Sequence, residues 1–307
     1  MTEPVTAAFV IYGLWKDHAV RHRYECPMRW ADLDMLGHVN NVTYLNYLRE
    51  ARVDFFAALG RTIDVDDLGE GLRIHRNQVV FAAPLLFRQR PVTIELWVSD
   101  IRTDGFALNY EIFDDIETGR RVYLRARAEV QPWLLAEDRP RGLTGSERLR
   151  LADYVEDGLE FSPVVGPGDL AVLPASYDLA IRLSDLDIYR RVSDVIFFEY
   201  FQEARVAYLF DLAARVDESR ELEIARTDIT YHRPVALRRE PYRVRSTVAA
   251  VGRTSFTVVS ELCDGGSVLA TAQVVLVGFD AKQQRAAALT DAQRAAVVAE
   301  HESALGR

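Results

Sequence analysis

The amino-acid sequence predicts an α+β protein in which one unit, a buried helix followed by antiparallel strands, occurs twice. Residues 24–52 and 177–205 align without a gap at an offset of 153. A repeat of this density does not arise by chance, so it indicates a duplicated unit. The identical pairs include Tyr24/Tyr177, Arg29/Arg182, Asp32/Asp185, Leu33/Leu186, Asp34/Asp187, Tyr47/Tyr200, Glu50/Glu203 and Arg52/Arg205.

Each copy begins with a short predicted strand, at 23–30 and 176–183, which leads into a polar loop and then a helix. The helices are expected at 40–59 and 193–214. A helix that is apolar nearly all round is a buried helix. The apolar residues of the first one cover most of its circumference: Val42, Tyr44, Leu45, Tyr47, Leu48, Ala51, Phe55 and Phe56.

Runs of alternating apolar and polar residues follow each helix and predict antiparallel strands. In the first copy they cover 92–98, 106–113 and 121–130, and in the second copy 242–250, 255–262 and 269–277. Turn residues such as Asp104-Gly105 and Asp264-Gly265-Gly266 separate them. A helix followed by such strands is an α+β pattern.

The repeat continues at an offset of 150, for example in Pro84/Pro234, and divides the chain into five parts. A Thr followed three residues later by Glu or Gln marks a helix start at Thr144 and at Thr290. The parts are an N-terminal extension (1–22), a first domain (23–135), a connecting segment with one helix (136–174), a second domain (175–280) and a helical tail (281–307).

Composition restricts the classes of partner and of compartment. The formal net charge of −9 argues against a nucleic-acid partner, which requires a basic surface. We find no signal peptide and no run approaching ~18 apolar residues, so no membrane span is expected. The two cysteines, Cys26 and Cys263, have no paired spacing, which fits a reducing compartment. We therefore expect a cytoplasmic protein.

The segment RWADLDMLGHVNNVTYLNYLREAR (29–52) resembles the 4-hydroxybenzoyl-CoA thioesterase branch of the hot-dog superfamily, and the tandem plant-type acyl-ACP thioesterases. The resemblance rests on Asp-x-Asp, Gly-His-Val-Asn-Asn and an aromatic-rich helix. It implies a double hot-dog, in which each unit is an antiparallel sheet wrapped around one long helix. The two units of one chain then form a pseudo-dimer with active sites at the seam.

The resemblance also implies the site. Asp34 is then the catalytic carboxylate, which either attacks the thioester carbonyl or activates water, both reasonable for a good acylating agent. His38 polarises the carbonyl or holds the water. Backbone amides at the helix start, preceded by Gly37 and Val39, stabilise the oxyanion. Asn40 and Asn41 either cap the helix or bind the pantetheine amides.

Several neighbouring residues have a second interpretation. Asp32 is expected to bond loop amides. Glu50 is a candidate catalytic carboxylate on the helix, but it is about 13 Å along the axis from the loop, and a buried pair with Arg52 or Arg205 is the preferred interpretation. Four arginines that flank strands either meet a CoA phosphate or, by default, form a solvated edge: Arg88, Arg90, Arg238 and Arg239.

The second copy keeps Asp187 but carries Arg190, Arg191, Ser193 and Asp194 where the first has Gly37, His38, Asn40 and Asn41. An arginine at the glycine position argues against the same oxyanion site, so we expect one active site per chain. Relative to the plant-type enzymes, Leu36 stands where those enzymes carry Asn.

The leading hypothesis is therefore an acyl-CoA or acyl-ACP thioesterase of fatty acid metabolism, without metal or organic cofactor, since CoA or phosphopantetheine belongs to the substrate. One alternative is a non-catalytic acyl-thioester-binding or scaffold protein. Another is a hot-dog hydratase or dehydratase, whose Asp/His arrangement is not found here. A chain monomer is feasible, and further pairing of chains through exposed strand edges is left open.

Overall fold

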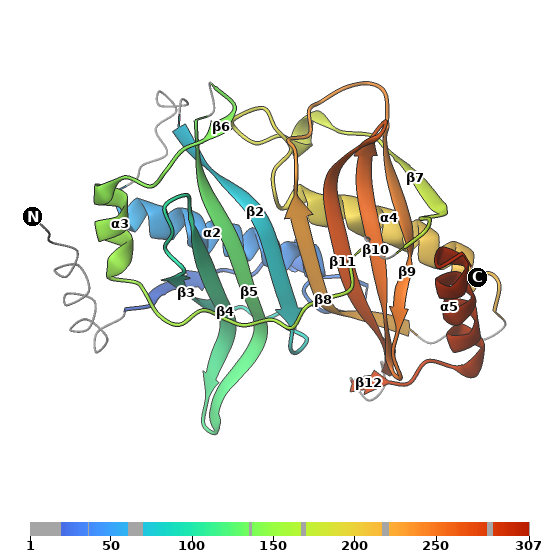
Figure 1. The fold of residues 1–307 in the computed structure, drawn as a ribbon. Coiled ribbons are helices and arrows are strands. Elements are labelled where there is room, and N and C mark those ends of the chain that lie inside the picture. Colours follow the sequence, from blue (N-terminus) through green and yellow to red (C-terminus); the bar gives the residue numbers. More distant parts are fainter. Residues whose placement is uncertain are drawn as a thin grey trace, which may run out of the picture.

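The computed structural model describes residues 20–35, 37–60, 70–134, 137–166, 170–216, 221–280 and 285–306. Most of the predicted N-terminal extension and Leu36 lie outside these residues. Within them the two copies form the two halves of the molecule, blue to green and yellow to red in Figure 1.

Each copy builds one long helix and five strands in the same order. The first copy contains β1 (His22–Cys26), α2 (Asn41–Ala58), β2 (Glu70–Phe81), β3 (Val92–Ser99), β4 (Phe106–Ile116) and β5 (Gly119–Leu134). The second contains β7 (Ala175–Leu179), α4 (Ile196–Ala213), β8 (Glu221–Tyr231), β9 (Tyr242–Val251), β10 (Ser255–Asp264) and β11 (Ser267–Asp280). The predicted helices and the six predicted alternating strands are confirmed, with shifted ends.

Between and after the copies lie short elements that begin as expected. The connection contains β6 (Arg139–Pro140) and α3 (Gly145–Ala152), and the tail contains β12 (Arg285–Ala287) and α5 (Asp291–Ala304). Both helices start with the predicted capping box, at Thr144 with Glu147 and at Thr290 with Gln293. The limits proposed for the two domains stay predictions.

All strands join one antiparallel sheet in the order β1-β3-β4-β5-β2-β8-β11-β10-β9-β7. The two long helices α2 and α4 lie against the same face of this sheet (Figure 1). The halves meet where β2 pairs with β8, and there Gln78 is opposite Asp228. These two residues are equivalents at the offset of 150, so a pseudo-twofold axis passes between them. The expected pseudo-dimer of hot-dog units is confirmed.

The central strands β2 and β8 were not among the predicted elements. Charged residues interrupt their apolar alternation, and both strands contain a bulge at the same place, near His75 and near Ala225. The charges lie at the junction of the two copies. There Asp228, fully buried, accepts hydrogen bonds from Gln78, Arg76 and Arg226 at 3.0, 3.2 and 2.6 Å. Apolar–polar alternation does not identify β2 and β8, because their polar side chains contact one another across the junction of the two copies rather than water.

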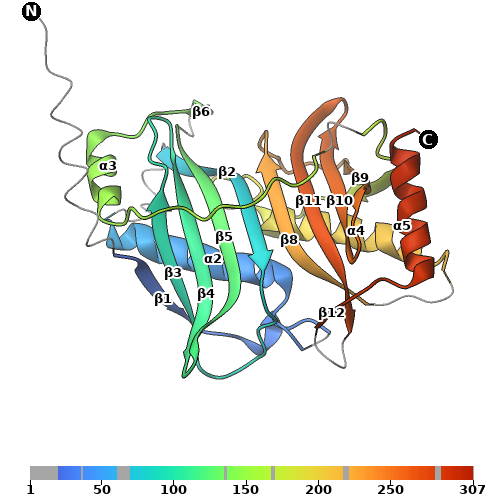
Figure 2. The same ribbon diagram turned by 60° about the horizontal axis from the view of Figure 1, so that its bottom comes forward.

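The connecting segment crosses the face of the sheet opposite the long helices (Figure 2). It is held strand by strand through its backbone. The Trp97 indole on β3 donates to the Asp157 carbonyl at 3.0 Å. The Leu159 amide donates to Asn109 on β4 at 2.9 Å. Arg226 on β8 donates to the Ser162 carbonyl at 2.7 Å. The segment therefore bridges the two halves of the sheet.

Two expectations about individual residues are wrong. Glu50 is exposed rather than buried with an arginine, as is Glu203. Arg52 instead binds Asp194 of the other copy, at 3.1 Å. Arg88 does not lie on a solvated edge, because it is mostly buried and forms an ion pair with the buried Asp114. By contrast Arg90 and Arg239 are exposed, as expected.

Among the described residues no helix combines the length and the apolar character needed to cross a membrane.

Candidate active site at the seam between the two copies

The loop before α2 is a tight hairpin closed by Asp34 and His38. The Asp34 amide donates to the His38 carbonyl at 2.8 Å, and the His38 amide donates to Oδ1 of Asp34 at 3.2 Å. Gly37 sits at the turn with φ of +77°. The carboxylate and the histidine predicted to act together are therefore brought together by the hairpin itself.

This hairpin is fixed to the core by residues on both sides. The Val39 amide donates to the Leu85 carbonyl at 2.9 Å, and the Asn40 amide donates to the Asp32 carbonyl at 2.8 Å. The Asp32 side chain in turn accepts from the Arg29 amide at 2.6 Å and from the Tyr47 hydroxyl at 2.5 Å. Asp32 thus has the structural role expected of it, and it anchors the loop to α2.

The start of α2 offers one amide that is not used by the protein. Asn40 caps the helix, since its side chain accepts from the Val42 amide at 2.9 Å. Asn41 is the first helical residue, whose amide has no acceptor within a helix. Within the described ranges no hydrogen bond from Asn41 is found. This amide, at the positive end of the helix dipole, is suited to an oxyanion.

The amides of Gly37 and Val39 were expected to serve the oxyanion, and the structure gives them other partners. The Gly37 amide donates to the Asp34 carbonyl at 3.1 Å, and that of Val39 to Leu85. A Cβ placed on Gly37 would meet nothing within 4 Å, so the turn requires glycine's backbone freedom rather than its small size. Among the predicted substrate-binding residues, Asn41 has the arrangement that the chemistry needs.

The second copy contributes a carboxylate that was missed from the sequence. Glu223 on β8 lies half-buried near the hairpin. Its pKa is raised, first by burial and then by the charge of Asp34, while His38 acts in the opposite direction. The His38 ring, itself buried, contacts the edge of Phe279 on β11 with centroids 6.4 Å apart. The site thus combines groups from both halves of the sheet.

The equivalent hairpin of the second copy has the same backbone. The Asp187 amide donates to the Arg191 carbonyl at 2.7 Å, and the Arg191 amide donates to Oδ1 of Asp187 at 3.1 Å. Asp34 and His38 form the same two bonds in the first copy. Arg190 adopts φ of +60° where Gly37 has +77°. The arginine at the glycine position therefore leaves the hairpin backbone intact. The copies differ after the hairpin, because α2 begins at Asn41 with Asn40 as its cap, whereas α4 begins at Ile196 without a side-chain cap.

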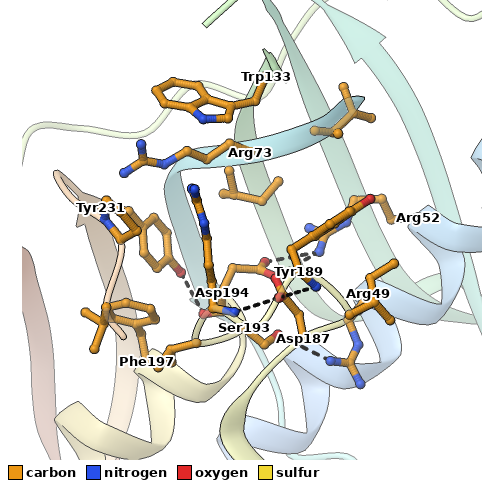
Figure 3. A pocket seen from close by; sticks show the side chains of 18 of the residues that line it. Arg49, Arg52, Arg73, Trp133, Asp187, Tyr189, Ser193, Asp194, Phe197 and Tyr231 are labelled. Carbon is orange, nitrogen blue, oxygen red and sulfur yellow. Dashed lines mark hydrogen bonds and ion pairs between the residues drawn. The ribbon is translucent and has the colours of Figure 1, made fainter. Parts of the chain in front are cut away.

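At this second seam the side chains carry different charges. Arg73 on β2 replaces Glu223, Arg191 replaces His38 and Asp194 replaces Asn41. A cavity of about 580 Å³ lies here (Figure 3). Burial raises the pKa of Asp187, which lines this cavity.

Within the described part of the chain no group of three or more His, Cys, Asp or Glu side chains is placed to hold a metal ion. Burial raises the pKa of Cys26 to about 12, so its thiol is a poor nucleophile near neutral pH.

Comparison with solved structures finds chains with the same overall fold. A putative oleoyl thioesterase from Lactobacillus plantarum superposes with a TM-score of 0.69 at 14% identity, covering 87% of this chain and 99% of its own. A 12:0-ACP thioesterase from Umbellularia californica gives 0.65 at 15% identity, covering 84% and 97%. An acyl-ACP thioesterase from Bacteroides thetaiotaomicron gives 0.61 at 14%, also covering 84% and 97%. These likenesses show the fold.

A family model described as the thioesterase-like superfamily matches the chain twice, over residues 28–139 and 181–297. The two matched segments correspond to the two copies of the repeat and together cover most of the sequence. The chain therefore belongs to the thioesterase-like superfamily and is a thioester hydrolase.

Proposed function

We propose that the chain hydrolyses acyl thioesters of CoA or acyl carrier protein at one site, formed by the Asp34 hairpin, the start of α2 and β8. The observation that carries this proposal is the Asp34 hairpin, which holds the carboxylate at the His38 amide and leads directly into the start of α2, where the Asn41 amide has no acceptor. A carboxylate and an amide donor at a helix N-terminus are the pair of groups that acyl transfer requires.

The chemistry is that of thioester hydrolysis. The Asp34 carboxylate attacks the thioester carbonyl carbon, or it accepts a proton from a water molecule that attacks this carbon. The carbonyl oxygen gains negative charge, and the Asn41 amide stabilises it. When the carbon–sulfur bond breaks, the thiolate leaves and takes up a proton. If water attacked, the acyl group leaves as a carboxylate. If Asp34 attacked, an anhydride between the acyl group and Asp34 remains, and a water molecule hydrolyses it to the free carboxylate and the Asp34 carboxylate.

Glu223 extends this site across the seam. A carboxylate that burial and a neighbouring charge hold at a raised pKa keeps its proton to a higher pH, which makes it suited to hold or pass a proton at the site. In this proposal Glu223 orients His38 or the attacking water, and Asp34 is the group that reacts.

The second hairpin is not part of this reaction. It has no imidazole. Its helix α4 begins only at Ile196, so Asp194, the counterpart of Asn41, is not the first helical residue, and its carboxylate is bound to Arg52. One working site per chain is therefore proposed.

The substrate class rests on the superfamily and on the neighbouring structures. Two of those structures are described as acyl-ACP thioesterases, from Umbellularia californica and Bacteroides thetaiotaomicron. The acyl chain and the choice of carrier are to be measured with a panel of acyl-CoA and acyl-ACP substrates.

The test is release of free thiol by the full chain and by three variants. We expect Asp34→Asn to lose at least about a hundredfold in kcat, the usual cost of removing a group that acts in the chemical step. Asp187→Asn, at the equivalent position, and Glu50→Gln, an exposed carboxylate on α2, are the matched controls and keep their activity. Equal loss in Asp34→Asn and Asp187→Asn would refute the single site. Absence of thiol release from every substrate would favour a binding protein.

A further inference from the structure

The cavity at the second seam is built by both copies. From the first copy α2 contributes Arg49, Arg52 and Phe56, β2 contributes Arg73 and β5 contributes Trp133; the second copy contributes the loop 187–194 with Phe197, Tyr231 and Arg233. Figure 3 shows the side chains of Arg49, Arg52, Arg73, Trp133, Phe197 and Tyr231 around this cavity. Its volume of about 580 Å³ is in the range of small-molecule sites.

The lining carries an excess of positive charge in an acidic protein. Five arginines and two aspartates line the cavity, whereas the whole chain has a formal net charge of −9. A cleft lined by one sign of charge concentrates ligands of the opposite sign. An anionic ligand is therefore favoured at this place on the molecule.

Two of the five arginines are neutralised within the protein. Arg52 donates to Asp194 at 3.1 Å, and Arg191 pairs with Asp138 at 2.9 Å. Asp187 does not neutralise a third, because its Oδ1 accepts the amides of Tyr189 and Arg191 in its own hairpin.

The other three, Arg49, Arg73 and Arg233, have no carboxylate partner within the described ranges. Arg49 donates only to the Ser193 hydroxyl, at 3.3 Å. The Arg73 guanidinium lies over the Trp133 ring, 4.7 Å from its centroid, in a half-buried position. Burial, and then the charge of Arg191, lowers the pKa of Arg73. An incoming anion would relieve both effects.

Apolar side chains form a second part of the lining, beside the polar Tyr189, Ser193 and Tyr231. They include Val53, Phe56, Ile74, Phe197 and Val235. A fully phosphorylated ligand would leave these surfaces unused, while a neutral lipid would leave three arginines without a partner. A single anionic head on an apolar body matches both parts of the cavity.

We propose that this cavity binds a carboxylic acid with an apolar chain, its carboxylate held by Arg73 and Arg233 and its chain against Phe56, Ile74 and Phe197. The copy that lost the catalytic side chains has thereby become a binding site for the class of molecule that thioester hydrolysis releases. The inference rests on the cavity and not on the role of Asp34, so binding can be tested whether or not Asp34 is catalytic.

The test is titration calorimetry of the full chain with octanoate, 1-octanol, coenzyme A and inorganic phosphate as probes. We expect octanoate to bind and the three other probes to bind at least about tenfold more weakly, the minimum effect of losing a charge-assisted pair. The same loss is expected for octanoate in Arg73→Met and in Arg233→Met. Arg253→Met removes an exposed arginine outside the cavity and leaves binding unchanged.

Three outcomes would overturn the proposal. The first is equal binding of 1-octanol, which would make the cavity a purely apolar site. The second is binding of coenzyme A or phosphate in preference to octanoate. The third is octanoate binding that survives in Arg73→Met and Arg233→Met but is lost in Asp34→Asn, which would place the ligand at the first seam. If Arg73→Met does not fold, as judged by its thermal transition, the exposed Arg233→Met decides.

Discussion

Arg52 on α2 reaches across the seam and donates through Nη2 to both carboxylate oxygens of Asp194, each at 3.1 Å. At the first seam the equivalent positions are Arg205, from the second copy, and Asn41, from the first. Asn41 is an amide, so Arg205 has no carboxylate opposite it. Arg205 is only 6% exposed, and among the described residues it has no acidic partner. The duplication has therefore left one half of the seam with an ion pair and the other with a buried lone charge.

Removing Arg52 should destabilise the protein. Burial opposes the charge on Arg52, but the Asp194 carboxylate outweighs it and raises the pKa of the guanidinium. In Arg52→Met, Asp194 keeps a buried charge without a partner. We expect the free energy of unfolding to fall by about 2 to 3 kcal/mol, near the lower end for such pairs because Asp194 retains some exposure. Urea unfolding followed by circular dichroism measures this, and an unchanged midpoint would contradict it.

Removing Arg205 should leave the free energy of unfolding unchanged or raise it, in contrast to the removal of Arg52. Burial lowers the pKa of Arg205 to about 10, because no carboxylate offsets the cost of the buried charge. Replacement by an apolar side chain of similar volume removes that cost. We expect Arg205→Met to unfold at equal or higher urea concentration, with a gain of up to about 1 kcal/mol. A loss as large as that of Arg52→Met would show that Arg205 has a partner at the first seam.

The capping box of α3 predicts that the protein loses stability at acidic pH. Arg141 donates to Glu147 at 2.7 and 2.8 Å, and these bonds, with the Thr144 amide, lower the pKa of Glu147 to about 2. Because the folded-state pKa lies below the unfolded value, the stabilisation is complete above about pH 4.5 and is lost as the pH falls towards 2. Glu147→Gln should therefore cost about 1 to 2 kcal/mol at pH 7 and much less at pH 2.

Thermal unfolding of wild type and Glu147→Gln between pH 7 and pH 2 checks this prediction. The difference in melting temperature should shrink as the pH falls. The control is Glu137→Gln, whose exposed ion pair with Arg139 should contribute less than about 0.5 kcal/mol at any pH. A constant difference between wild type and Glu147→Gln would rule out the pH linkage.

The parts of the fold that were predictable are those with a simple environment. α2 and the strands β3, β4, β9 and β10 are rich in apolar residues, and β3 and β4 are buried along almost their whole length, so their apolar pattern identifies them. β2 and β8 face each other's charges across the pseudo-twofold axis. There Arg76 and Gln78 donate hydrogen bonds to Asp228. Apolar periodicity assumes that polar side chains face water, so it does not predict these buried polar contacts.

The candidate site divides in the same way. Asp34, His38 and Asn41 lie within one short stretch of sequence, so a motif suffices to bring them together. Glu223 comes from another copy and joins them only when the halves pair. Its signal was available in the repeat: at the offset of 150, Glu223 is aligned with Arg73, and a reversal of charge at equivalent positions marks a place where the two seams differ.

Glu223 should affect the pH dependence of hydrolysis as well as its rate. Burial and then the charge of Asp34 raise the pKa of Glu223, so Glu223 loses its proton at a higher pH than an ordinary glutamate. Glu223→Gln removes this titrating group, so the change in kcat/KM that accompanies its titration should disappear from the pH profile. In the proposed role, in which Glu223 orients His38 or water, the variant should also lose about tenfold in kcat near neutral pH. Glu203→Gln, which replaces an exposed carboxylate on α4, is the control and should show neither change. A fall in kcat with an unchanged pH profile would limit Glu223 to a packing role, whereas a fall in kcat together with the altered profile would support a working group supplied by the second copy to the site of the first.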